Sequence, residues 1–186
     1  DVFDPIASFW QTSPKFFIPA GEKSKTLESA QKIWTWLDEQ ATDKGHFLII
    51  LGGGTVTDLG GFVASTFKRG IPFILIPTTI VGMVDAAIGG KNGVNLAQFK
   101  NQIGVFQPPL FTHIDVRYAA TLDPLERTNG WMELVKHSLI SKASFWKSIQ
   151  EVNIHRDGAI TPWIEQAAQV KLAIVDQDFH DQSSRK

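Results

Sequence analysis

The sequence has no cysteine, no excess of either charge and no long apolar run, and each absence excludes a class of protein. Without cysteine there is no disulfide and no thiolate metal site, so a metal must be held by His, Asp or Glu. The formal net charge of −1 offers no basic surface for nucleic acid or for a membrane. The apolar stretches are too short to cross a bilayer, and residues 1–4 do not resemble a signal peptide. We therefore expect a cytoplasmic globular protein that binds neither nucleic acid nor membrane.

The hydrophobic pattern of the first two thirds of the chain predicts an α/β fold. Apolar residues at helical spacing predict a helix over 27–41, and a continuous apolar run predicts a buried strand over 47–51. A second helix is expected over 58–67 and a second strand over 71–77, which together form a βαβ unit with a parallel sheet. A short strand is expected over 111–116.

From about residue 123 the pattern is helical only. One helix is expected over 124–150, broken at Gly130, and another over 161–178 with Pro162 near its start. The chain of 186 residues fits one domain plus part of another. We predict an α/β nucleotide-binding domain with a parallel sheet over 1–122, followed by the start of an α-helical domain over 123–186.

A glycine-rich turn lies between the first predicted strand and the next helix. Its sequence is Gly-Gly-Gly-Thr-Val-Thr-Asp over 52–58, which does not match the Gly-x-Gly-x-x-Gly pattern. Glycines let a ligand approach the backbone, and a helix N-terminus offers free N–H groups to a diphosphate. The alternative is a tight turn in which Asp58 caps the helix.

Two hydroxyl side chains, Thr78 and Thr79, follow the second predicted strand. Ligands of open parallel sheets bind beyond the carboxyl ends of the strands, so these residues are candidates for nucleotide contacts. By itself, a capping role for Thr79 on the next helix is the simpler interpretation.

The segment 82–95 is dense in glycine, and it carries Lys91. Lys100 and Asn101 follow shortly after it. Glycine-rich backbone suits a loop that wraps a ligand, and lysine suits a phosphate or a polarised oxygen. The alternative is a solvated loop whose lysines have no role.

Glu133, Lys136 and His137 share one face of a predicted helix. They form either a partly exposed ion pair or a functional group, and a Glu133–His137 metal clip would supply only two ligands. The remaining histidines are isolated in sequence and are interpreted as surface or structural residues: His46, His113, His155 and His180.

Several of these segments together resemble the 3-dehydroquinate synthase family. The similar segments are 18–25, 52–58, 67–107 and 133–140, and the most specific of them is Gly-Gly-Lys-Asn-Gly-Val-Asn over 89–95. Lys171 and Arg185 match the later pattern of the family, so the resemblance covers nearly the whole chain.

The resemblance implies a homodimeric lyase of the shikimate pathway that uses catalytic NAD and a divalent metal, Zn²⁺ or Co²⁺. Its substrate is a phosphorylated keto sugar acid, 3-deoxy-D-arabino-heptulosonate 7-phosphate (DAHP), and its products are 3-dehydroquinate and phosphate. By residue-wise match, NAD would contact Glu22, Lys25, Gly53, Gly54, Thr55, Asp58, Thr78, Thr79, Lys91, Lys100 and Thr121. The substrate would contact Asp85, Lys91, Asn101, Lys136, Lys171 and Arg185, with Arg69 reaching a neighbouring subunit's substrate and Glu133 as a metal ligand.

The sequence also departs from the family pattern. Thr57 stands where the family usually has glycine, and His137 replaces a usual aromatic residue. The family's two metal-binding histidines follow the Lys171–Arg185 match, but the sequence ends at Lys186, so we expect an incomplete and inactive enzyme. The alternatives are a related cyclase such as 2-deoxy-scyllo-inosose synthase, a metal-dependent polyol dehydrogenase of the same fold, and a catalytically incomplete NAD-binding module.

Overall fold

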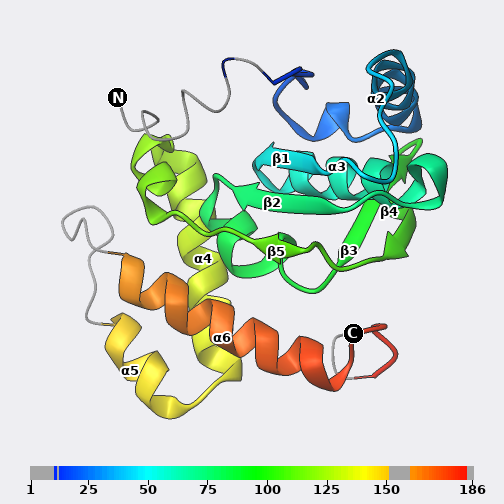
Figure 1. Cartoon of the computed structure of the whole chain (residues 1–186). Coiled ribbons are helices and arrows are strands. Elements are labelled where there is room, and N and C mark those ends of the chain that lie inside the picture. The colour runs from blue at the N-terminus through cyan, green and yellow to red at the C-terminus, as the bar shows by residue number, and fades with distance from the viewer. Residues whose placement is uncertain (1–10, 12, 151–159, 184–186) are drawn as a thin grey trace.

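A three-stranded parallel sheet in the order β1-β2-β5 forms the centre of the computed structural model, which describes residues 11, 13–150 and 160–183 (Figure 1). β1 (Leu48–Gly52) and β2 (Phe73–Pro77) pair from Leu48–Phe73 to Gly52–Pro77, and β5 (Phe111–Thr112) pairs with β2. Helices cover both faces of this sheet, which explains why its strands are nearly continuous apolar runs. The predicted α/β class is confirmed.

Two helices, α2 and α3, cover one face of the sheet. α2 (Leu27–Glu39) begins at Thr26, whose side chain accepts a hydrogen bond from the Ser29 N–H. α3 (Gly54–Thr66) follows β1 and packs against β1, β2 and α2. Their shared core includes Ala30, Ile33, Leu37, Ile50, Leu59, Val63, Phe73 and Leu75.

Three further helices lie on the other side of the sheet, below it in Figure 1, with α5 packed on α4 and farther from the strands. They are α4 (Pro124–Ile140), α5 (Ala143–Gln150) and α6 (Thr161–Gln177). The π-helix η3 (Gly82–Ala86) joins them to the sheet, because α4 and α6 both contact it. The second core contains Ile76, Ile80, Met83, Val84, Leu134, Phe145, Ile149 and Ile164.

A β-hairpin extends from the sheet, where the sequence analysis expected a glycine-rich loop. β3 (Lys91–Leu96) and β4 (Phe99–Phe106) are antiparallel, so the expected loop over 82–95 is wrong for its second half. Gly93 and Gly104 oppose each other, and a Cβ on either would lie within 2.6 Å of backbone oxygen on the other strand. The glycines therefore permit close approach of two strands.

Other boundaries also differ from the expectations. α3 begins at Gly54 rather than at residue 58, and the strand expected over 111–116 is only Phe111–Thr112. α4 continues through Gly130 and ends at Ile140, so the break lies ten residues later than expected. The expected helix over 161–178 is confirmed as α6. Short helical turns complete the description: η1 (Glu22–Ser24), η2 (Phe67–Arg69) and η4 (Val116–Thr121).

A helix that crosses a membrane must be long and apolar, and none of the described helices is both.

Replacing Gly130 by alanine should destabilise the chain despite the higher helix propensity of alanine. The new Cβ would lie 2.4 Å from Cβ of the buried Ile80. Overpacking costs about 1–3 kcal/mol, and the propensity gain offsets up to about 1 kcal/mol of it. Urea unfolding should show a lower free energy of unfolding for Gly130→Ala and little change or a small gain for the control Asn129→Ala, at an exposed position of the same helix. An unchanged stability of Gly130→Ala would show that Ile80 does not require glycine there.

Candidate functional site

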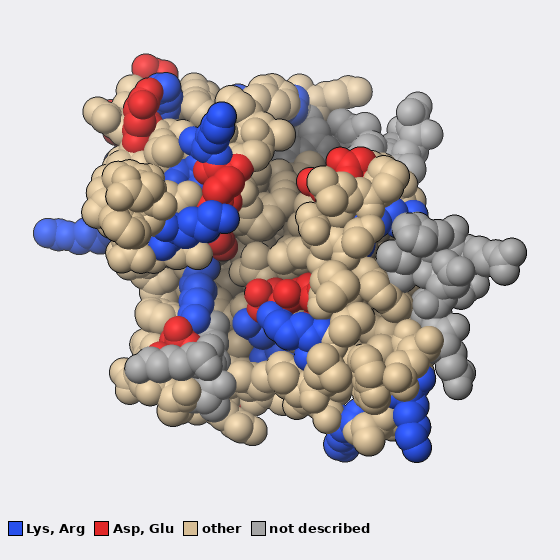
Figure 2. Space-filling model, turned by 180° about the vertical axis from the view of Figure 1, so that it is seen from behind, with Lys and Arg blue, Asp and Glu red and all other residues tan. Residues whose placement is uncertain are grey.

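A cleft of about 550 Å³ opens between α3, η3, the β3–β4 hairpin and the end of α6. Charged side chains of both signs gather around a hollow on the face of the molecule shown in Figure 2. Five of the predicted site residues are among those that line the cleft: Asp58, Asp85, Lys91, Asn101 and Lys171.

A buried ion pair forms one wall of the cleft. Lys25 is 3% exposed, and its Nζ lies 2.5 Å from Oδ2 of Asp58 and donates to Oδ1 of Asn101, also at 2.5 Å. Asn101 has a left-handed backbone (φ 55°), which asparagine tolerates better than most residues. Asp58 belongs to the interior of α3 and the N-cap is Gly53, so the capping interpretation of Asp58 is wrong.

A second set of polar side chains adjoins this pair. The Glu22 carboxylate accepts hydrogen bonds from Thr55 Oγ1 (3.1 Å) and Asn95 Nδ2 (2.8 Å), and the Asn101 N–H donates to Asn95 Oδ1 (2.9 Å). Through these contacts η1, α3 and both strands of the hairpin are fixed to one another. Asn95 was not among the predicted site residues.

The electrostatics of the two carboxylates in this wall differ. Burial raises the pKa of Asp58 to about 6, because desolvation outweighs the charge and hydrogen bond of Lys25. Burial also acts on Glu22, but the hydrogen bonds from Asn95 and Thr55 and the charge of Lys25 outweigh it and hold the pKa of Glu22 below its usual value. Glu22 is therefore the more firmly ionised of the two at neutral pH.

The opposite wall carries a cluster of possible metal ligands. One ligand atom each from Asp85 in η3 and from Glu133 and His137 in α4 lies within 4.8 Å of the others. Asp85 pairs with Lys171 of α6, and Glu133 pairs with Lys136. Two carboxylates and an imidazole are donors that suit a divalent ion such as Zn²⁺ or Co²⁺. The structure thus adds Asp85 to the Glu133–His137 pair that the sequence suggested.

Burial and neighbouring charges set the protonation states in this cluster. Burial would raise the pKa of Asp85, but the hydrogen bond and charge of Lys171 outweigh it and hold the pKa below its usual value. Burial, followed by the charge of Lys136, lowers the pKa of His137 to about 4. The ring is therefore neutral at pH 7, which is the form that can ligate or donate to a metal ligand.

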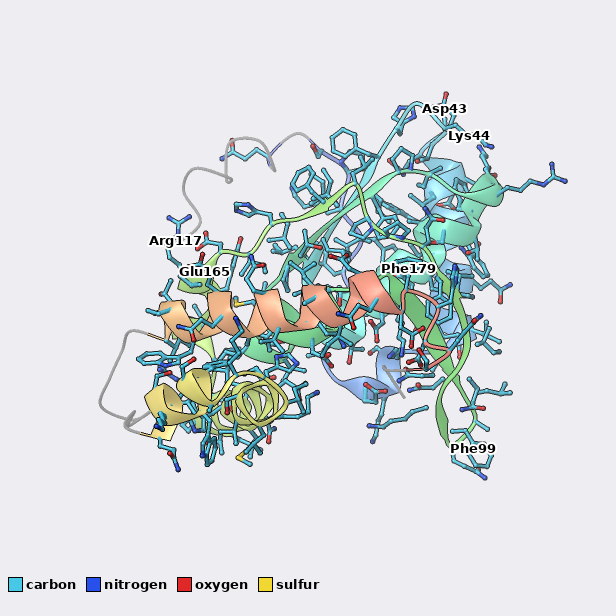
Figure 3. The ribbon with its side chains drawn as sticks, turned by 90° about the horizontal axis from the view of Figure 1, so that it is seen from below. Asp43, Lys44, Phe99, Arg117, Glu165 and Phe179 are labelled. Atoms are coloured by element: carbon cyan, nitrogen blue, oxygen red, sulfur yellow. The ribbon has the colours of Figure 1, made fainter. Side chains whose placement is uncertain are left out.

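The segment after α6 adds a residue that the sequence analysis had not selected. Asp181 lines the cleft, and its Oδ2 lies 2.6 Å from Nζ of Lys91. The Phe179 ring packs against Phe106 of β4 at a centroid distance of 6.2 Å, so the segment is held against the hairpin. Figure 3 shows Phe179 at the end of α6, and Phe99 lies at the distant tip of the hairpin. Sequence spacing carried no signal for the Lys91–Asp181 contact, because 90 residues separate the two.

The glycine turn is closely packed against the residues that follow β2. A Cβ on Gly53 would meet Thr79 Cγ2 at 2.9 Å, and one on Gly54 would meet Ala86 at 3.2 Å. Thr79 Oγ1 accepts from the Gly82 N–H (3.1 Å), so the capping interpretation of Thr79 is confirmed, and the Thr78 N–H donates to the Gly52 carbonyl (2.9 Å). The N-cap residue of α3 is Gly53, which has no side chain to cap the helix, so the first N–H groups of α3 could donate to an anion.

The remaining predicted site residues lie elsewhere or outside the described residues. Arg69 is exposed in η2, where Lys68, Arg69 and Gly70 have consecutive positive φ angles of 48°, 66° and 106°. Thr121 is exposed at the end of η4, and Lys100 is exposed on β4. Neither they nor Arg69 are among the described residues that line the cleft. Arg185 lies outside the described residues, as does His155.

Comparisons with known proteins show which sequences and structures this chain resembles. A family model described as 3-dehydroquinate synthase N-terminal matches residues 15–129. The curated 3-dehydroquinate synthase of Parabacteroides distasonis is 38% identical over 179 residues, covering 95% of this chain and 51% of that protein. That of Chlamydia caviae is 40% identical over 171 residues, covering 90% of this chain and 45% of that protein. The chain thus spans about half the length of the curated relatives it matches.

Two solved structures show the same fold. The 2-epi-5-epi-valiolone synthase ValA of Streptomyces hygroscopicus, with NAD⁺ and Zn²⁺ bound, has a TM-score of 0.80 at 30% identity and covers 89% of this chain and 48% of its own. A 2-deoxy-scyllo-inosose synthase has a TM-score of 0.74 at 24% identity, covering 89% of this chain and 48% of its own.

Removing the charge of Lys25 should destabilise the chain in a pH-dependent way. A raised pKa means that Asp58 favours folding when protonated, and that this contribution is lost as the pH rises through about 6. In Lys25→Met the pKa of Asp58 rises further, because the positive charge beside the carboxylate is gone. The variant therefore loses most stability at a pH where Asp58 is ionised in the wild-type chain. We expect a loss of about 3 kcal/mol in the free energy of unfolding at pH 8 and a smaller loss at pH 5.

Urea unfolding at the two pH values measures this difference. Lys32→Met is the matched control, because the Lys32–Glu28 pair is exposed and should change stability by only a few tenths of a kcal/mol. The double variant Lys25→Met/Asp58→Asn should recover part of the loss at pH 8. A penalty that is equal at both pH values would contradict the role of the Asp58 charge.

Proposed function

The chain belongs to the 3-dehydroquinate synthase family, and we propose that the whole protein converts DAHP to 3-dehydroquinate and phosphate with catalytic NAD and a divalent metal, Zn²⁺ or Co²⁺. In that role it would act in the shikimate pathway, in the cytoplasm. Residues 1–122 would form the NAD-binding α/β domain, and residues 123–186 the first helices of the metal- and substrate-binding domain.

The observation that carries this proposal is the meeting of lysines and metal-type donors in one cleft. Lys91 and Lys171 line the cleft and would bind the anionic groups of a phosphorylated keto acid. Asp85 lines it as well and belongs to the donor cluster with Glu133 and His137. An enzyme that eliminates phosphate needs both kinds of group next to the same substrate.

The glycine turn, which adjoins the Lys25–Asp58 wall of the cleft, supports an NAD site. The uncapped N-terminus of α3 follows the glycine turn, which suits the diphosphate. Glu22 and Thr55 are held together next to this turn, where they could accept and donate hydrogen bonds to the cofactor. When bound, NAD would supply reversible oxidation of a substrate hydroxyl, and this chain's residues would position both molecules. The similar valiolone synthase structure contains NAD⁺ and Zn²⁺.

A divalent metal would be held by Glu133, with Asp85 and His137 close enough to assist. The metal would polarise a substrate oxygen. Lys136 and Lys171 neutralise Glu133 and Asp85 in the structure, and both lysines would be free to contact substrate once a cation had taken over that role. Asn101 would hold its position through Lys25 and Asn95.

The proposed activity is tested by following phosphate release from DAHP by the whole protein in the presence of NAD and Co²⁺ or Zn²⁺. We expect turnover without net accumulation of NADH, because the ketone formed in the first step is reduced again before product leaves. Phosphate release from glucose 6-phosphate instead would indicate a 2-deoxy-scyllo-inosose synthase, and accumulating NADH would indicate a polyol dehydrogenase. The 186 residues alone are expected to be inactive.

We further propose that the protein is a homodimer in which Arg69 completes the site of the other subunit. Arg69 is exposed, and it is not among the lining residues of its own chain's cleft. Its turn has three consecutive positive φ angles, which is an unfavourable backbone conformation. The Lys68 side chain stabilises the turn by donating a hydrogen bond to the Thr42 carbonyl (2.7 Å). An exposed arginine in such a turn could reach a second subunit.

Subunit mixing tests this arrangement. Arg69→Ala should lower kcat/KM at least about 100-fold, as the loss of a phosphate-binding donor does. Lys91→Ala should also be inactive. Random mixing of the two inactive variants should restore about a quarter of wild-type activity, because half of the dimers are mixed and each of these has one intact site. No recovery on mixing would show that Arg69 does not act across the dimer.

A further inference from the structure

His137 is a buried polar side chain with an unusual lack of partners. It lies one helical turn after Glu133 in α4 and is 1% exposed. Its Nδ1 has no hydrogen-bond partner among the residues that the structure describes, whereas its Nε2 lies 3.7 Å from Oε1 of Glu133. That distance is too long for a hydrogen bond, but it requires only a small movement to become one.

The position of the ring proton follows from these contacts. If Nδ1 carried the proton, a buried N–H would have no acceptor, which is costly. If Nε2 carries it, the N–H faces the Glu133 carboxylate. Direct ligation of a metal through Nε2 would require the proton on Nδ1, where it has no acceptor. Ligating histidines almost always donate their other N–H to a partner, so this arrangement is unfavourable.

Two nitrogen donors near Glu133, one from Lys136 and one from His137, approach the same carboxylate oxygen. Lys136 Nζ and His137 Nε2 both lie nearest to Oε1 of Glu133. Donors that fix one carboxylate oxygen leave the other, Oε2, to face a cation.

We propose that His137 is a positioning residue, which orients the Glu133 carboxylate toward a divalent metal by donating its Nε2–H to Oε1. This proposal rests on the proposed function only in requiring a metal at Glu133. The role is specific to a nitrogen donor at this position and does not depend on the volume of the ring.

Co²⁺ affinity of the whole protein tests the proposal, measured by competition with a chelator. His137→Phe keeps a ring of similar size but has no donor, and it should bind Co²⁺ about 10- to 100-fold more weakly. Its metal-free Tm should stay the same or rise, because a buried nitrogen without a partner has been removed. His137→Gln, whose amide N–H can reach a position close to that of Nε2, should regain part of the affinity.

Two controls locate the ion. Glu133→Gln should abolish Co²⁺ binding, and His113→Gln, at an exposed and isolated histidine, should have no effect. If His137→Phe binds Co²⁺ as tightly as the wild type, the proposal is overturned. It is also overturned if the variant loses as much free energy of unfolding without metal as it loses in Co²⁺ binding. Absence of Co²⁺ binding in the wild-type chain, or binding that persists in Glu133→Gln, would also overturn it. The proposed function fails separately, if the whole protein releases no phosphate from DAHP while Co²⁺ still binds in a Glu133-dependent way.

Discussion

The buried ion pair between Lys25 and Asp58 is the interaction on which the cleft depends. It connects the segment before α2 with α3, and through Asn101 it connects both to β4. A buried lysine is tolerated only when its charge and its N–H groups are satisfied, and here a carboxylate and an amide oxygen both accept from it. The hairpin also meets the N-terminal segment through Asn95, whose side chain donates to Glu22 and whose N–H donates to the Lys25 carbonyl (2.9 Å). The ion pair is therefore the charged centre of a wider set of contacts that holds this wall together.

The other wall depends on η3, which lies between the sheet and the helices. π-helical turns are rare overall, but those that occur are often found at functional sites. The wider turn redirects a side chain. Here η3 is anchored in the core by Met83 and Val84 and presents Asp85 to Lys171 of α6. A Cβ on residue 82 would lie 3.0 Å from Cβ of Pro77 and 3.1 Å from the Thr79 hydroxyl, so glycine lets the turn pack closely against the end of β2. The donor cluster with Glu133 and His137 is thus a consequence of packing between η3 and α4.

The sequence predicted those features that depend on local pattern. Apolar runs and helical spacing gave β1, β2, α2 and α6, and the family resemblance selected the charged residues that line the cleft. The hairpin was missed because the pairing of Gly93 with Gly104 is a contact between strands, and local composition suggested a loop instead. The prediction of a helix break at Gly130 was wrong, because the sequence does not show that Ile80 packs against this position and leaves no room for a Cβ. Asp181 was missed because its partner Lys91 is distant in sequence.

The charges of the second wall are balanced within it. Asp85 and Glu133 are each paired with a lysine, and His137 is neutral, so the five side chains carry no net charge. A divalent cation between the carboxylates would replace both lysines as their counter-charge and leave the wall with a charge of about +2. That positive charge would then be available to a phosphorylated acid in the same cleft. Cation and anionic substrate should therefore each strengthen the binding of the other, because linkage makes such coupling reciprocal. The paired lysines keep the two carboxylates compatible with burial until the cation is present.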